Sequence, residues 1–146
     1  MKFEQKKDLP HGCRLLYGIT KRDDRGALTF VESNTLPFAI KRIFWITGVP
    51  EGKHRGGHAH SSCSEAVFVV SGAFTMHLSD GESEADVRLT APESGVLVPR
   101  GVWCELRDFT ADCICVVAAS EPYNRQGYIN TYEEYLKHCA AHKSEL

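Results

Sequence analysis

Short apolar segments alternate with turn residues along the whole chain, and this rhythm restricts the fold more than any other feature. Twelve glycines and six prolines interrupt the sequence, and the runs between them are rich in Val, Ile, Phe, Leu and Thr. Such spacing is typical of an all-β sandwich or barrel. We expect strands at residues 14–20, 27–32, 41–47, 65–70, 73–79, 85–90, 95–98, 102–109 and 113–119.

Turn sequences and one capping signal add detail to this pattern. Asp23–Gly26 and Asp80–Gly81 carry the Asx and glycine geometry of tight hairpins. Near the end of the chain, Asn130 or Thr131 can cap a helix, and Glu134 stands three residues after the threonine. We therefore predict a short C-terminal helix that packs on the sandwich as a lid.

Size and charge limit what the chain can do. Its 146 residues suffice for one globular domain and leave no room for a second. Seventeen basic and nineteen acidic side chains give a net charge of −2, so no global positive field attracts nucleic acid or an anionic membrane.

The sequence shows no signal peptide and no membrane-spanning segment, and this bears on the compartment in which we expect the protein. Residues 1–8 lack the apolar run of a signal peptide, and no segment is long and apolar enough to span a membrane. The six cysteines are scattered without a C-x-x-C pair, which favours reduced, mostly buried thiols. We expect a cytoplasmic protein.

The densest polar cluster lies at residues 52–60, between two apolar segments. His58 and His60 stand one residue apart, so on an extended chain both imidazoles point to the same face. Gly56 and Gly57 permit a close approach of the backbone. The pair can therefore enter one cavity, although exposed loop histidines would show the same spacing.

The histidine pair belongs to a longer pattern. Gly52, His58, His60, Glu65 and Gly72 fit G-x5-H-x-H-x4-E-x6-G, which resembles the first signature motif of the cupins. That resemblance implies an all-β jelly-roll barrel with a short C-terminal helix, in which the H-x-H strand faces the interior. The single cupin domain would span residues 1–146, with the jelly roll at about 13–120 and the C-terminal segment and helix at 121–146.

The second cupin motif is present with one departure. Gly95, Pro99 and Gly101 fit it, but Cys104 stands where the motif has its last histidine. In metal-dependent cupins such positions hold Fe, Mn, Ni or Zn, which suit these ligands. The corresponding set of candidate metal ligands here is His58, His60, Glu65 and Cys104.

A narrower resemblance covers the chain from near Leu15 to near Leu136. It is similar to the dTDP-sugar 3,4-ketoisomerases of the WxcM-like family within the RmlC-like cupins. The segments that carry the similarity are Arg25–Gly26, Leu36–Ile46, Gly48–Gly52, Arg55–His60, Pro99–Trp103, Asp108–Phe109, Ala119–Tyr123 and Tyr128–Ile129.

This resemblance implies an isomerase of nucleotide-sugar biosynthesis. It would shift the keto group of a dTDP-4-keto-6-deoxyhexose from C4 to C3, on the way to deoxysugars of surface polysaccharides, without a metal or other cofactor. The hydrogen at C3 lies α to the carbonyl, so a base can remove it, form an enediol and return the proton at C4. The family also pairs through its sheets, which implies a homodimer.

The resemblance and side-chain chemistry together assign roles to six residues. We favour His60 as the base and His58 as its partner in proton transfer, with the reverse order open. Guanidinium groups offer paired donors to phosphate oxygens, and aromatic rings offer surfaces for a base or sugar, although core packing is the more common fate of a tryptophan. The candidate substrate-binding residues are Arg55, Arg42, Trp103 and Tyr123.

The chain departs from the family at two places, and other functions stay open. Glu65 stands where the family usually has a non-ligand, and residues 44–47 lack a family tyrosine that Tyr123 or Tyr128 could replace. One alternative is a metal-dependent cupin, a dioxygenase or isomerase. Another is a non-catalytic cupin that only binds a sugar nucleotide.

Overall fold

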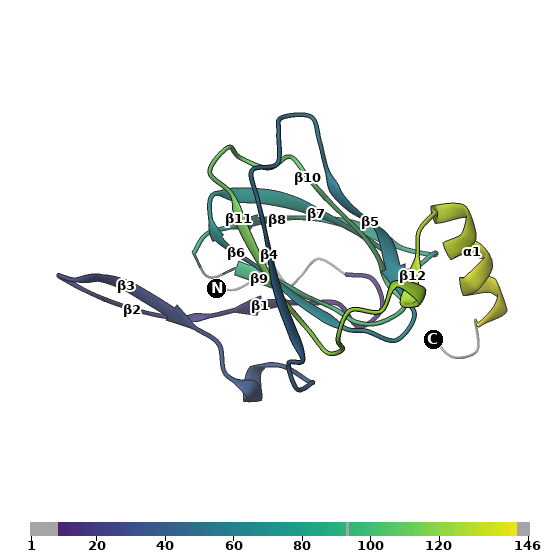
Figure 1. Cartoon of the computed structure of the whole chain (residues 1–146), viewed down its shortest axis with the longest axis horizontal. Helices are drawn as coiled ribbons and strands as arrows, with labels where there is room; N and C mark the ends of the chain where they lie inside the picture. The colour runs from purple at the N-terminus through teal and green to yellow at the C-terminus, as the bar shows by residue number, and fades with distance from the viewer. Residues whose placement is uncertain (1–8, 93, 143–146) are drawn as a thin grey trace.

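Two five-stranded antiparallel sheets face each other and form the body of the molecule (Figure 1). The computed structural model describes residues 9–92 and 94–142. The first sheet has the order β1-β9-β6-β11-β4. Its strands are β1 (Arg14–Tyr17), β4 (Arg42–Thr47), β6 (Glu65–Ser71), β9 (Ser94–Val98) and β11 (Ile114–Ala119).

The second sheet has the order β12-β5-β10-β7-β8. From β4 to β12 consecutive strands alternate between the two sheets, except for the hairpin of β7 and β8, and the predicted all-β cupin architecture with its short C-terminal helix is confirmed. The strands of this sheet are β5 (Arg55–His60), β7 (Ala73–Ser79), β8 (Glu84–Thr90), β10 (Trp103–Arg107) and β12 (Tyr128–Ile129).

The core lies between the sheets and follows the period-two pattern of the strands. Phe74, Met76 and Leu78 of β7 alternate with polar residues in the sequence, and all three are 0% exposed. Each such side chain contributes about 1.5–3 kcal/mol by leaving water. Val67 and Val69 of β6 meet them from the first sheet.

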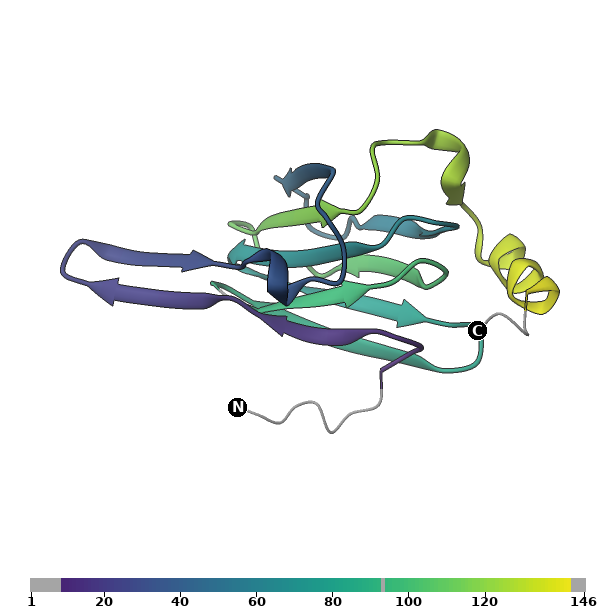
Figure 2. The same ribbon diagram turned by 90° about the horizontal axis from the view of Figure 1, so that it is seen from below.

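A two-stranded arm extends from the body at the N-terminal side (Figures 1 and 2). It consists of β2 (Ile19–Asp23) and β3 (Gly26–Phe30), joined by the predicted turn, in which the Asp23 carboxylate accepts the Arg25 N–H at 2.8 Å. We expected one strand over 14–20, but the chain divides at Gly18. A Cβ there would lie 2.8 Å from Thr29 Cγ2, so the glycine permits the close crossing where the arm begins.

The helix α1 (Tyr132–Ala141) lies at the end of the body opposite the arm (Figure 2). Thr131 caps it as predicted, because its hydroxyl accepts the Glu134 N–H at 3.1 Å. Tyr135 is fully buried and its hydroxyl donates to the Gly101 carbonyl at 2.6 Å. The helix therefore seals the side of the second sheet that faces away from the core. The described residues also include the short 3-10 helices η2 (Ser33–Thr35) and η3 (Arg125–Gly127).

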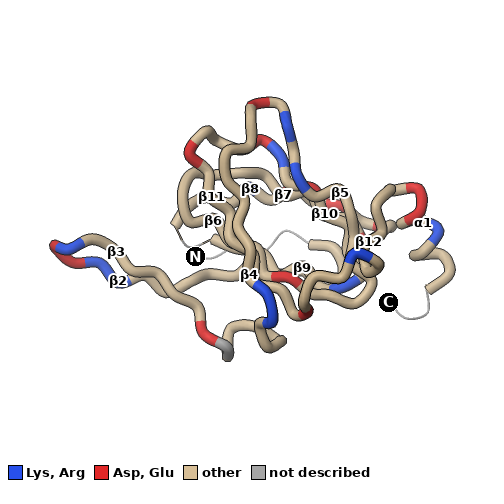
Figure 3. The backbone as a smooth tube through the Cα atoms, viewed as in Figure 1, with Lys and Arg blue, Asp and Glu red and all other residues tan. Residues whose placement is uncertain are grey.

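Basic and acidic positions are interspersed over the sheets, the arm and the helix (Figure 3). In this view blue and red positions lie near one another along the described backbone, in agreement with the balanced composition. No helix in the described part of the chain is long and apolar enough to cross a membrane. Residues 1–8, on which the signal-peptide prediction rests, lie outside the described residues.

Candidate active site

A cavity of about 280 Å³ opens between the two sheets. Strands from both sheets and the segment after β11 supply its walls, which combine apolar side chains with several polar groups. The lining residues are Arg42, Phe44, Ile46, Arg55, Gly56, His58, Glu65, Val67, Met76, Cys104, Leu106, Val117, Tyr123 and Tyr128.

The strand β5 places the histidines on one face, and its glycines make this possible. Gly56 and Gly57 have φ of +79° and +81°, a region that favours glycine. A Cβ on Gly56 would lie 3.1 Å from the Cys104 carbonyl of β10, and the pairing of β5 with β10 shifts register beside this point. The glycines therefore let β5 bend close to β10 while His58 and His60 point inward.

His58 lines the cavity and is a neutral base. Burial, with a further contribution from neighbouring His60, lowers the pKa of its imidazole from 6.5 to about 4, and Glu65 partly offsets both effects. A neutral imidazole in a partly closed site has a free lone pair to accept a proton.

His60 lies behind His58 rather than on the cavity wall. It is 5% exposed, and its Nε2 atom lies 3.2 Å from Oε2 of Glu65. Its ring centroid is 4.9 Å from that of His58 and 4.5 Å from that of Tyr128, its cross-strand neighbour on β12. The two histidines and Tyr128 thus form a compact group of three rings.

The predicted cations and Tyr123 gather at the same cavity. Arg42 and Arg55 both line it, so Arg42 faces inward at the start of β4. The Arg42 guanidinium lies 5.8 Å from the centre of the Tyr123 ring, and its Nε donates to the Glu121 carbonyl at 3.3 Å. Arg42 is therefore already held by protein groups, whereas Arg55 is exposed.

Trp103, a predicted substrate contact, does not line this cavity. The alternation of β10 turns Cys104 and Leu106 into the cavity and therefore turns Trp103 to the opposite face. There the indole is buried against Tyr132 and Tyr135 of α1, with ring centroids 5.3 and 5.8 Å away. Its role is to join the helix to the sheet.

The structure gathers a different set of potential metal ligands from the predicted one. Cys104 lies opposite His58 in the sheet, but burial raises the pKa of its thiol well above the usual value, which disfavours a thiolate ligand. Among the described residues, the group of His, Cys and carboxylate atoms within 4.8 Å of one another belongs to His60, Cys63 and Glu65.

Sequence reasoning missed two residues of the site. Cys63 was missed because it stands between the motif positions and carries no spacing signal of its own. Phe44 was also missed, although strand alternation with inward Arg42 would have placed it in the cavity, where the Arg42 guanidinium lies 5.2 Å from the centre of the Phe44 ring.

Comparison with known proteins shows the family of the chain. The sequence model of a family described as FdtA, WxcM-like, C-terminal, matches residues 11–140. A TDP-4-oxo-6-deoxy-α-D-glucose-3,4-oxoisomerase from Aneurinibacillus thermoaerophilus is 34% identical over 119 residues, which cover 81% of this chain and 86% of the relative.

Solved structures of 3,4-ketoisomerases have the same architecture. An enzyme from Helicobacter canadensis is 31% identical with a TM-score of 0.85, and the match covers 88% of this chain and 98% of that one. QdtA from Thermoanaerobacterium thermosaccharolyticum, solved in complex with TDP, is 30% identical with a TM-score of 0.85 and coverages of 90% and 96%. A histidine-to-asparagine variant of QdtA has been solved with TDP-4-keto-6-deoxyglucose.

Proposed function

The chain belongs to the FdtA, WxcM-like C-terminal family of sugar-nucleotide 3,4-ketoisomerases, and from this premise we propose that it acts on a dTDP-linked 4-keto-6-deoxyhexose as a single-domain enzyme. The QdtA complexes with TDP and with TDP-4-keto-6-deoxyglucose support this substrate. The keto group moves from C4 to C3 through an enediol.

The observation that carries the mechanism is the neutral imidazole of His58 on the cavity wall. We assign His58 as the base that removes the C3 proton, which is acidic because it lies α to the C4 carbonyl. The resulting imidazolium returns the proton to C4. This reverses the order favoured by the sequence, because His60 lies behind His58 and away from the cavity surface.

The reaction also moves a proton between oxygens. The C3 hydroxyl loses its hydrogen and the C4 oxygen gains one, so the overall change needs a second donor and acceptor. Tyr128 lines the cavity, and its ring centroid is 4.8 Å from that of His58. We assign its hydroxyl to this step, since phenol groups both donate and accept hydrogen bonds.

We assign diphosphate binding chiefly to Arg55, because it is the cavity arginine without an ion-pair partner among the described residues. Arg42 is turned toward Glu65 and the Glu121 carbonyl. A guanidinium at the mouth offers paired donors to phosphate oxygens. Tyr123 is exposed beside the cavity and offers its ring to the sugar or the base.

The experiment is conversion of dTDP-4-keto-6-deoxyglucose followed by NMR, which reports activity, position and stereochemistry together. We expect a 3-keto product from the wild type and none from His58→Asn. His77→Asn is the matched control, because His77 lies on another strand between Glu84 and Asp86. Unchanged substrate with the wild type, or full activity in His58→Asn, would contradict the proposal.

We propose that the reaction uses no metal. The potential ligand Glu65 lies 3.9 Å from the Arg42 guanidinium, and a dication at His60, Cys63 and Glu65 would stand beside that fixed positive charge. The cytoplasm is the proposed compartment, since all six cysteines are free thiols.

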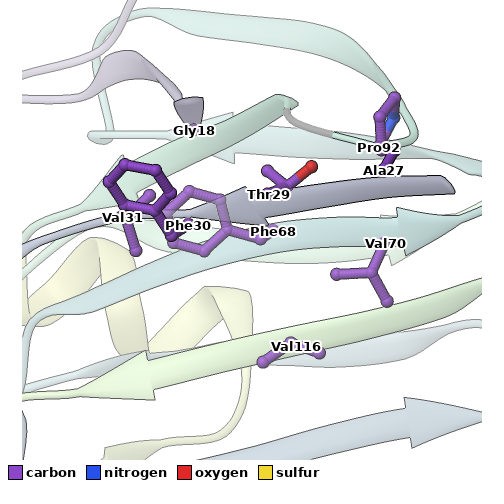
Figure 4. A pocket seen from close by; sticks show the side chains of 9 residues that line it. All are labelled: Gly18, Ala27, Thr29, Phe30, Val31, Phe68, Val70, Pro92 and Val116. Atoms are coloured by element: carbon purple, nitrogen blue, oxygen red, sulfur yellow. The ribbon is translucent and has the colours of Figure 1, made fainter. Parts of the chain in front are cut away.

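We also propose a homodimer that pairs through the outer face of the first sheet. Trp45 is 67% exposed there, and Leu28 on the arm is 62% exposed. A groove of about 440 Å³ runs between the arm and the sheet, with Phe30, Phe68 and Val70 among its lining residues (Figure 4). An isolated two-stranded hairpin is marginally stable in water, and exposed apolar surface of this kind marks an interaction site.

Light scattering at micromolar concentration tests the dimer. We expect twice the mass of the chain for the wild type and a shift toward monomer for Trp45→Lys and Leu28→Lys. Leu136→Lys is the control, because this exposed leucine lies on α1 at the opposite end of the molecule. A wild-type monomer would overturn the pairing.

A further inference from the structure

Glu65 is a carboxylate buried at the wall of the cavity, where an ion is costly. It begins β6, and its side chain is 6% exposed. Removing a carboxylate from water costs several kcal/mol unless other groups compensate. An apolar residue would occupy this buried strand position without that desolvation cost. We therefore consider which neighbouring groups compensate the buried carboxylate.

Among the described residues, a guanidinium, an imidazole and the Cys63 thiol lie near the carboxylate, with the Cys63 sulfur within 4.8 Å of it. Its Oε2 atom lies 3.9 Å from Nη2 of Arg42 and 3.2 Å from Nε2 of His60. Arg42 is itself anchored through the carbonyl of Glu121. The guanidinium balances the charge of Glu65, and the imidazole supplies the nearest polar hydrogen.

This contact restricts the protonation of His60. A carboxylate oxygen can accept a hydrogen bond, so it favours the His60 tautomer that carries its hydrogen on the facing Nε2 atom and its lone pair on Nδ1. Nε2 of His60 is buried and makes no hydrogen bond with the described residues. The Glu65 oxygen 3.2 Å away lies within reach of this atom.

The orientation of His60 bears on the groups that meet the substrate. Its ring stands at 78° to His58 and at 59° to Tyr128. A rotation of the His60 ring would therefore disturb both neighbours, since the three ring centroids lie within 4.9 Å of one another.

We propose that Glu65 is a positioning residue of the ketoisomerase site, whose acceptor oxygen holds His60 as the Nε2–H tautomer in one orientation and thereby fixes His58 and Tyr128. The inference rests on the proposed function. Glu65 transfers no proton in this role. It resembles the outer partners of ligating histidines, whose removal costs about 10–100-fold in activity.

Two substitutions at Glu65 separate the acceptor from the rest of the side chain. Glu65→Gln keeps an acceptor oxygen, whereas Glu65→Leu has similar volume and none. We expect kcat within about threefold of wild type for Gln and about 10–100-fold lower for Leu, with KM little changed in both. Glu105→Leu is the control, because Glu105 is a half-buried carboxylate paired with Trp103 and Arg107 outside the cavity. A folded Leu variant with wild-type kcat, or equal losses for Gln and Leu, would overturn the inference.

NMR of the wild-type protein without substrate tests the tautomer of His60 directly, even if the Glu65→Leu variant does not fold. Proton and nitrogen NMR of the imidazole groups should show a downfield, slowly exchanging Nε2–H signal, assigned to His60 by its loss in His60→Asn. The signal should persist in Glu65→Gln. A His60 that carries its hydrogen on Nδ1 alone would refute the positioning role. A wild type that fails to turn over substrate would instead refute the proposed function, and the NMR result would still stand.

Discussion

Acidification is the perturbation that tests the assignment of His58 most directly. An ordinary histidine loses its function as a base when it is protonated near pH 6.5, whereas burial and the proximity of His60 hold the pKa of His58 at about 4. At pH 5.5 a base with a pKa of about 4 is about 97% unprotonated, but one with a pKa of 6.5 is only about 9% unprotonated. The two cases differ about tenfold in active enzyme.

The assay is kcat/KM for the dTDP-4-keto sugar from pH 4 to pH 8, because this parameter reports ionisations of the free enzyme. We expect a plateau that extends below pH 5.5 in both the wild type and His77→Asn. Circular dichroism at each pH shows whether the fold persists. An acid limb with its midpoint near 6.5 in a folded enzyme would refute the assignment of His58.

The same shift predicts how stability depends on pH. The pKa of His58 is lowered by folding, so the unfolded chain binds the proton first and stability falls as the pH drops from 6.5 toward 4. A shift of this size corresponds to at most about 3.4 kcal/mol, and contact of the ring with the open cavity reduces that figure. Urea titrations at pH 7 and pH 4.5 measure it, and a contribution of the opposite sign would contradict the buried neutral imidazole.

Three further predictions concern other parts of the molecule. Arg55→Ala should raise KM for the dTDP sugar about tenfold and leave kcat nearly unchanged, whereas Lys53→Ala, outside the cavity, should change neither. Phe74→Ala should lower the free energy of unfolding by about 3–5 kcal/mol in a urea titration, because this fully buried ring packs on Phe109 at 5.2 Å. Dialysis against a chelator should leave turnover intact, and stoichiometric Fe, Mn, Ni or Zn by elemental analysis together with lost activity would favour the metal-dependent alternative.

Most strands were predictable because their pattern reflects burial, whereas β5 and β12 were not among the expected strands. In β7 the alternation of Phe74, Met76 and Leu78 with polar residues determines which face is inside. The break at Gly18 was not predictable, since the apolar pattern continues from β1 into β2 and only the crossing with Thr29 requires the glycine. Local periodicity reports the environment of one strand and carries no information on where the strand leaves its sheet.

In the site, too, the local sequence pattern predicts the face of a strand on which a residue lies, but not its tertiary contacts. The H-x-H spacing predicts that His58 and His60 share a face, and they do. It cannot tell which ring reaches the cavity, because this depends on Glu65 and Tyr128, which arrive from other strands. The sequence also misplaces Trp103. Its motif lies near the cavity, but strand alternation turns its side chain toward α1.

The two histidines of the H-x-H motif have different surroundings, which suit the two different roles proposed for them. His58 meets the cavity and stays neutral, so its lone pair is free to take a carbon-bound proton. His60 lies 3.2 Å from a carboxylate oxygen, and in the proposed positioning role the hydrogen on its Nε2 faces that oxygen. An exchange of roles would require Glu65 to face His58 instead, and the anchoring of Arg42 to the Glu121 carbonyl helps to keep the carboxylate where it is. We therefore expect the buried carboxylate to determine which of the two histidines acts as the base.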